Sequence, residues 1–307
     1  MTPEMFWEWF ITPFQYDFMI KALMVGAVVG LVCAVLSCYM ILKGWSLMGD
    51  AVSHSVLPGV VIAYILGLPF AVGAFGFGLL SVLAIGFIKR QSRLKEDAVM
   101  GIVFTGFFAL GLVLISRTPS TVDLTHILFG NVLGIPTSDV IQTFVIGGIT
   151  LVAILILRKD LMLFCFDENQ ARAIGLNTTV LYYTLLTLLA LTIVAALQTV
   201  GIILVISMLI TPGAIGYMLT DRFNRMMLIA GFSSVSSSLI GAYLSYQLDA
   251  STGGCIIVFQ TLVFVTVLIF APKQGLIGRS LLARRERQIA KVGLEGSAHP
   301  TLQPSGD

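Results

Sequence analysis

Apolar runs of about 20 residues recur along the whole chain, and this recurrence restricts what the chain can fold into, because a helix of that length crosses a hydrocarbon core of about 30 Å. Of the 307 residues, 57% are hydrophobic and only 11% are charged. That is too little charge to cover the surface of a soluble domain of this size. We therefore expect an all-α polytopic membrane protein.

Nine stretches have the length and composition of a transmembrane helix, although eight or ten are also compatible because two of the nine contain interior prolines. The expected spans are 18–42, 50–68, 70–88, 97–116, 138–157, 179–197, 199–219, 226–248 and 253–271. Residues 1–271 would form the transmembrane domain. Residues 272–307 would form a tail that is basic at first and then, we expect, disordered.

The distribution of lysine and arginine predicts the orientation of the chain, because these residues concentrate in cytoplasmic loops. If the N-terminus lies outside, every lysine and arginine except Lys21 and Arg117 falls on the cytoplasmic side. The opposite orientation would leave almost all of them outside. We therefore expect the N-terminus outside and the C-terminus in the cytoplasm.

The segment LMGDAVSHSVLPG, residues 47–59, carries polar groups where a membrane helix is expected to begin. Asp50 and His54 are four residues apart, so on a helix they share a face. Pro58 has no N–H, so the carbonyl of His54 would lose its usual helical partner. Ionisable groups and broken helices at membrane depth usually line a cavity or a path for ions.

A carboxylate and an imidazole together suit divalent ions such as manganese, iron or zinc. Two ligands are too few for tight binding, and a two-fold partner subunit would double them. The same spacing fits a second interpretation, in which Asp50 is an N-cap at the start of the second span and His54 is satisfied by Ser53 or by a backbone group.

The connection 158–178 is longer than a turn and contains DENQARAIG at positions 167–175, whose spacing predicts a short amphipathic helix ending at Gly175. In the expected orientation this helix lies in the cytoplasm, where it could dock a partner. The apolar residues available for docking are Leu163, Phe164, Phe166 and Ile174. An ordinary solvated connector is the alternative.

Two further features are open to a functional and a structural interpretation. In ISMLITPGAIG, residues 206–216, Pro212 predicts a kink that either lines the pathway, like the one at Pro58, or serves only helix packing. In the outer loop after the fourth span, Asp123 and His126 either receive an ion from a donor protein or are merely solvated.

The sequence argues against an intramembrane enzyme such as a metalloprotease. It has no GxxxxGK[ST] P-loop, so any ATP hydrolysis must occur on another chain, and it has no HExxH helix or catalytic dyad of an intramembrane metalloprotease. We expect a transport protein with no catalytic residues. The alternative to an ATP-driven importer is an ion-coupled secondary transporter, which would usually carry more than one intramembrane carboxylate.

Several blocks of sequence, in the same order, resemble the integral permease family of ABC transporters for zinc, manganese and iron. The resemblance covers nearly the whole chain and is carried by PFQYDFMIKAL, LKGWSLMGDAVSHSVLPGVV, EDAVMGIVFTGFFALGLVLIS, HILFGNVLGI, FDENQARAIGLNT and GIILVISMLITPGAIG. SHSVLPG, with proline at position 58, looks more like the manganese and iron branch, because zinc permeases tend to have AHASLLG-like text there.

The resemblance implies roles for particular residues. Asp50 and His54 match the family's G-D-x-x-[SA]-H pattern, which contributes to metal coordination in the translocation path. Glu168, Ala171 and Gly175 match the element that couples the permease to a cytoplasmic ATPase.

The resemblance also implies a setting. The chain would move manganese or iron(II), in preference to zinc, across the bacterial cytoplasmic membrane. Its partners would be a second permease subunit (the same chain or a paralogue), cytoplasmic ATP-binding subunits and an extracytoplasmic metal-binding lipoprotein. We expect no permanently bound cofactor, ATP only on the partner subunit, and no nucleic-acid partner.

Overall fold

The computed structural model describes residues 12–118, 134–271 and 275, and every regular element in this part of the chain is helical. A single 3-10 turn, η1 (Thr12–Gln15), precedes the first span. Nine stretches of the described chain are long and apolar enough to cross a membrane, which confirms the expected number. They are α2 (Asp17–Lys43), α3 with α4 (Met48–Ser55 and Leu57–Leu66), α5 (Phe70–Gln91), α6 (Glu96–Arg117), α8 (Thr137–Ile156), α11 (Thr178–Val200), α12 (Ile202–Leu219), α13 (Phe223–Leu248) and α14 (Thr252–Phe270).

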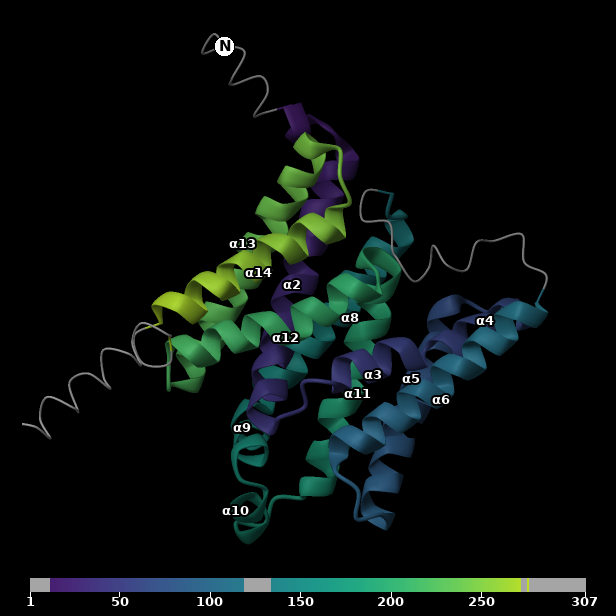
Figure 1. Cartoon of the computed structure of the whole chain (residues 1–307), viewed down its shortest axis with the longest axis vertical. Helices are drawn as coiled ribbons and strands as arrows, with labels where there is room; N and C mark the ends of the chain where they lie inside the picture. The colour runs from purple at the N-terminus through teal and green to yellow at the C-terminus, as the bar shows by residue number, and fades with distance from the viewer. Residues whose placement is uncertain (1–11, 119–133, 272–274, 276–307) are drawn as a thin grey trace, which may run out of the picture.

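The bundle is built around α2. Figure 1 shows α12, α13 and α14 on one side of α2, and α4, α5 and α6 on the other side, beyond α11. Of the apolar stretch of α2, 72% is buried, against 11% for α14. Apolar side chains can face lipid as readily as protein, so burial rather than composition shows where a helix lies. By this measure α2 is the central helix and α14 faces outward.

Small residues allow the central helices to approach one another closely. The Ser37 hydroxyl on α2 donates to the carbonyl of Ile210 at 3.1 Å and accepts from the N–H of Gly213 at 2.9 Å, so it bridges the backbone of α12 on both sides of the buried Pro212. A Cβ atom on Gly213 would lie 2.6 Å from the carbonyl oxygen of Ser37. Pro212 therefore lies in a packed helix contact within this chain.

The second span is broken. Helix α3 ends at Ser55, α4 begins at Leu57, and Pro58 lies in the first turn of α4, where a missing N–H costs no helical hydrogen bond. The carbonyl of His54 loses its usual helical partner, as the sequence predicted. It accepts instead from the N–H of Val56. The break turns the chain between the segment with Asp50 and the segment that packs on α5.

A substitution at Gly213 should separate α12 from α2. Gly213→Val places a side chain against the Ser37 backbone and should destabilise the protein by roughly 1–3 kcal/mol, the usual effect of overpacking. Thermal unfolding of the detergent-purified chain measures the effect. Gly148→Val on α8 is the control, because nothing lies within 4 Å of the added Cβ atom. Equal melting temperatures for the two variants would contradict this contact.

Candidate metal site and docking segment

Asp50 and His54 lie one turn apart on α3 and point toward one another. The Nε2 atom of His54 is 3.3 Å from Oδ1 of Asp50, and the side chains are 28% and 35% exposed, respectively. A carboxylate oxygen and an imidazole nitrogen at this separation can bind one ion together. Their partial exposure leaves an open side from which an ion or a further ligand can approach.

Two aromatic side chains of α6 hold the imidazole of His54 in place. The ring centroids of Phe104 and Phe108 are 5.3 and 5.2 Å from that of His54. The Nδ1 atom of His54 is buried and has no hydrogen-bond partner among the described residues. A buried imidazole nitrogen without a partner is costly unless another group binds the ring.

The alternative interpretation of this segment is wrong. The N-cap of α3 is Leu47, and Asp50 lies inside the first turn. The Ser53 hydroxyl does not satisfy His54, because it donates to the carbonyl of Gly49 at 2.7 Å. Neither polar side chain is therefore explained by capping or by a local hydrogen bond to serine.

A single copy of the described chain offers only two metal ligands at this place. The described ranges contain no group of three or more histidine, cysteine, aspartate or glutamate side chains that could hold a metal ion. Manganese and related ions take about six ligands, and zinc about four. An ion held here would therefore need further ligands from beyond the described side chains of one copy.

The segment between α8 and α11 forms two short helices, α9 (Arg158–Phe166) and α10 (Glu168–Ala173), at the bottom of the bundle in Figure 1. Asp167 caps α10: its Oδ1 accepts from the N–H groups of Asn169 and Gln170 at 2.9 and 3.0 Å. Gly175 follows the helix with φ of +90°, a left-handed conformation that favours glycine. The predicted short helix therefore forms, and its end is where the glycine indicated.

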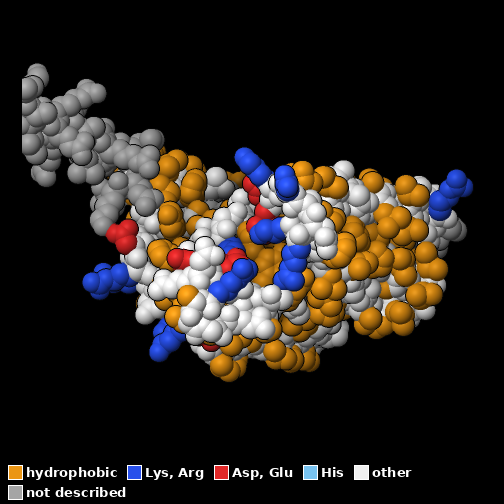
Figure 2. Space-filling model, turned by 90° about the horizontal axis from the view of Figure 1, so that it is seen from below, with side chains coloured by type: hydrophobic (Ala, Val, Ile, Leu, Met, Phe, Trp, Pro, Cys, Tyr) orange, Lys and Arg blue, Asp and Glu red, His pale blue; other side chains and the backbone are white. Residues whose placement is uncertain are grey.

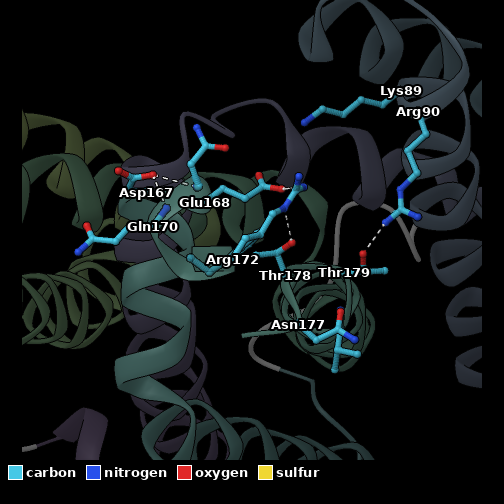
Figure 3. A network of polar contacts seen from close by, with 12 residues as sticks. Lys89, Arg90, Asp167, Glu168, Gln170, Arg172, Asn177, Thr178 and Thr179 are labelled. Atoms are coloured by element: carbon cyan, nitrogen blue, oxygen red, sulfur yellow. Dashed lines mark hydrogen bonds and ion pairs between the residues drawn. The ribbon is translucent and has the colours of Figure 1, made fainter. Parts of the chain in front are cut away.

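Glu168 is held from two sides. Its Oε2 accepts from Lys43 Nζ of α2 at 3.1 Å. Its Oε1 accepts from Arg172 Nη2 one turn further along α10, as Figure 3 shows. Arg172 also donates through Nε to the Thr178 hydroxyl at 3.0 Å. Sequence reasoning did not identify Lys43, because no local pattern indicates a partner 125 residues away.

These two cations determine the ionisation of Glu168. Burial alone would raise the pKa of the carboxyl group, but the hydrogen bond and charge of Lys43 and the charge of Arg172 outweigh burial. The pKa therefore lies below its usual value of 4.5. Glu168 is a carboxylate at neutral pH, and α10 is tied to α2 by an ion pair.

One recess lies beside α9 and another beside α10. An apolar one of about 480 Å³ is lined by residues of α2, α9, α12 and α13, among them Leu163, Phe166 and Tyr217. A polar one of about 200 Å³ is lined by Lys89, Arg90, Glu168, Arg172, Thr178, Thr179, Tyr182 and Gly86. Figure 2, which looks at this end of the molecule, shows lysine and arginine side chains gathered around a hollow with an apolar floor.

The remaining predicted residues are placed as follows. Ala171 is fully buried on the inner face of α10. Phe166 and Ile174 are 79% and 63% exposed. Of the other residues predicted to dock a partner, Phe164 is fully buried and Leu163 partly so. Asp123 and His126 lie outside the described residues, as does the tail from residue 276.

Comparison with known proteins gives consistent matches over almost the whole chain. The model of the ABC 3 transport family matches residues 15–271. The manganese transport system membrane protein MntB of Synechocystis is 65% identical over 274 residues, which cover 89% of this chain and 90% of that protein. The chelated iron transport system membrane protein YfeD of Yersinia pestis is 54% identical, over 84% of this chain and 87% of that protein.

One solved structure is similar in sequence as well as in fold. PsaBC from Streptococcus pneumoniae, in complex with Fab, aligns with a TM-score of 0.78 and 40% identity. The alignment covers 86% of this chain and 96% of that one.

The ion pair of Glu168 predicts a pH-dependent stability. Glu168→Gln should destabilise the purified chain by about 0.5–1 kcal/mol at pH 7, since the pair is partly exposed. Because the pKa is lowered in the folded state, this stabilisation is present above pH 4.5 and is lost as the pH falls through the lowered pKa. Melting temperatures of wild type and variant, measured from pH 7 downward, should converge in acid. A difference of constant size would show that the charge of Glu168 is not responsible.

Proposed function

The chain belongs to the ABC 3 transport family, and on that premise we propose that it is the membrane permease subunit of an ATP-driven importer of manganese or iron(II). The similar proteins named above belong to manganese and chelated iron transport systems. The ligand chemistry agrees with these metals, since carboxylate oxygen and imidazole nitrogen suit manganese(II) and iron(II). The pairing of Asp50 and His54, which neither an N-cap nor a hydrogen bond to Ser53 explains, carries the proposal.

The metal passes through the membrane by way of weak, reversible coordination. Conduction requires that an ion be released as readily as it is bound, so a small ligand set on each chain suits a transporter better than a storage site. Asp50 and His54 are partly exposed and lie beside a break in the span, as in other membrane ion sites built on broken helices.

A second permease subunit completes the metal site. Two-fold pairing brings two Asp50–His54 pairs to one axis and gives four protein ligands, whereas the described residues of one copy offer no group of even three. The second subunit is either another copy of this chain or a close paralogue. The partial exposure of both side chains in the single chain supports this arrangement.

The α10 end of the bundle faces the cytoplasm of a bacterial cell and receives the ATPase. The excess of lysine and arginine at this end favours that orientation. The exposed Phe166 and Ile174 offer apolar contacts, and the polar recess carries Lys89, Arg90 and Arg172 against one carboxylate. An ATPase surface that combines apolar and acidic side chains fits these two recesses.

The opposite end of the permease receives the metal from an extracytoplasmic binding lipoprotein. Asp123 and His126 in the outer loop are the candidates to accept the ion there. ATP binding and hydrolysis on the cytoplasmic subunits then alternate access to the Asp50–His54 site. This chain supplies the path and the ligands, and the ATPase supplies the energy.

Removing the charge of Asp50 should abolish transport. In vesicles containing the permease and its ATPase, Asp50→Asn should lower manganese uptake by roughly tenfold or more, because one ligand of each pair is lost. His54→Ala should have the same effect. Asp139→Asn on α8 is the matched control and should transport normally. Normal uptake by Asp50→Asn would exclude Asp50 as a ligand.

The same vesicles separate the proposal from an ion-coupled secondary transporter. An ATPase subunit disabled in hydrolysis should stop uptake completely. Uptake that continues under a proton gradient alone would contradict an ATP-driven mechanism.

A charge on the exposed apolar residues beside α10 should prevent docking. Ile174→Asp and Phe166→Asp place a carboxylate where we expect apolar contacts, so each should reduce co-purification of the ATPase by roughly tenfold. Ser138→Asp is the control, since it adds the same charge at an exposed position in the first turn of α8, at the end of that helix opposite to α9. Equal loss in all three variants would mean that α9 and α10 do not form the docking surface.

A further inference from the structure

Lys43 is an unusual lysine because its charged end is directed into the protein. It is the last residue of α2, and its side chain is only 12% exposed. The ammonium group lies 3.1 Å from Glu168 Oε2 and 3.4 Å from the carbonyl oxygen of Phe164, and it sits 4.0 Å from the centroid of the Phe164 ring. Three contacts therefore fix it to α9 and α10.

The chain that follows Lys43 leads to the metal site through a short segment closed by hydrogen bonds. Gly44 ends α2 in a left-handed conformation with φ of +75°. The N–H of Trp45 donates to the carbonyl of Met40 at 2.9 Å, and the N–H of Met48 donates to the carbonyl of Trp45 at 3.2 Å. These two backbone hydrogen bonds close the turn, and α3 begins directly after it.

Trp45 anchors this turn in the bundle. Its side chain is 1% exposed and packs edge-on against Tyr182 of α11, with ring centroids 5.3 Å apart. A turn that is closed by hydrogen bonds and anchored by a buried side chain transmits a displacement rather than absorbing it, because packed interiors deform little. Asp50 lies in the first turn of the helix that this segment starts.

Lys43 therefore connects α10 with the turn that leads into α3. We propose that Lys43 is a positioning residue, which transmits the displacement of α10 to α3 and so sets the position of Asp50 and His54. The inference rests on the proposed function, in which α10 receives the ATPase. Lys43 is not among the metal ligands proposed above, and its side chain is only 12% exposed.

The contacts of Glu168 support this role over a direct one in docking. Both of its oxygen atoms are engaged within the chain, one by Lys43 and one by Arg172. Of the two cations, Arg172 belongs to α10 itself and reaches only Thr178 at the start of α11, so it does not connect α10 to α2. Lys43 is the partner on a different helix, and it carries the connection between α10 and α2.

The test measures coupling in vesicles that contain the permease, the ATPase and the metal-loaded binding protein. Lys43→Met keeps the length of the side chain but removes its charge, and Lys43→Arg restores a cation. Lys43→Met should still co-purify with the ATPase and hydrolyse ATP, while the manganese transported per ATP falls roughly fivefold or more. Lys43→Arg should recover most of this ratio.

Lys21→Met, at the other end of the same helix, is the matched control and should leave the ratio unchanged. An unchanged ratio in Lys43→Met, or an equal fall in Lys21→Met, would overturn the inference. Loss of ATPase binding in Lys43→Met and also in Lys43→Gln would overturn it as well, because the residue would then serve docking or folding. Failure of the proposed function is distinguishable, since the wild-type chain would then not bind the ATPase at all.

Discussion

A hydrocarbon layer provides no hydrogen-bond partners, and this constraint shapes every span of the chain. The spans are helices because a helix satisfies its own backbone, and they carry few charges because an ionisable group at membrane depth is costly. Exceptions to the rule are therefore informative. The clearest one is the second span, which is interrupted at Val56 and carries Asp50 and His54 on its first segment.

The rest of the bundle makes this exception possible. The Ser37 hydroxyl joins α2 to the backbone of α12, and Gly59 of α4 lies so close to Gly73 of α5 that a Cβ atom on either would clash with the other backbone. The approach of Gly59 to Gly73 holds α4 against α5 by close packing, which replaces the hydrophobic driving force that is absent in lipid. The polar segment can then remain partly exposed without loosening the fold.

The parts of the structure that could be predicted from sequence are those determined locally. Hydropathy predicted the nine spans, proline predicted the interruption near residue 58, and Gly175 predicted the end of α10. The parts that could not be predicted are long-range side-chain contacts. Nothing in the local sequence indicates that Lys43 binds Glu168, or that Phe104 and Phe108 enclose His54.

These long-range contacts change the interpretation of the site. Spacing alone left Asp50 open to a role as an N-cap, and the described capping residue, Leu47, removes that alternative. The short stretch of chain from Lys43 to Asp50 also links the proposed docking segment to the candidate metal site. Under the proposed function, energy from the ATPase would reach Asp50 and His54 along this route.

Magnetic resonance of manganese(II) bound to the purified permease, labelled with nitrogen-15 histidine, tests the central claim most directly. The chain contains only three histidines. The account predicts a hyperfine coupling between the manganese and an imidazole nitrogen, and its disappearance in His54→Ala. Bound manganese without an imidazole coupling, or with one that survives the loss of His54, would contradict it.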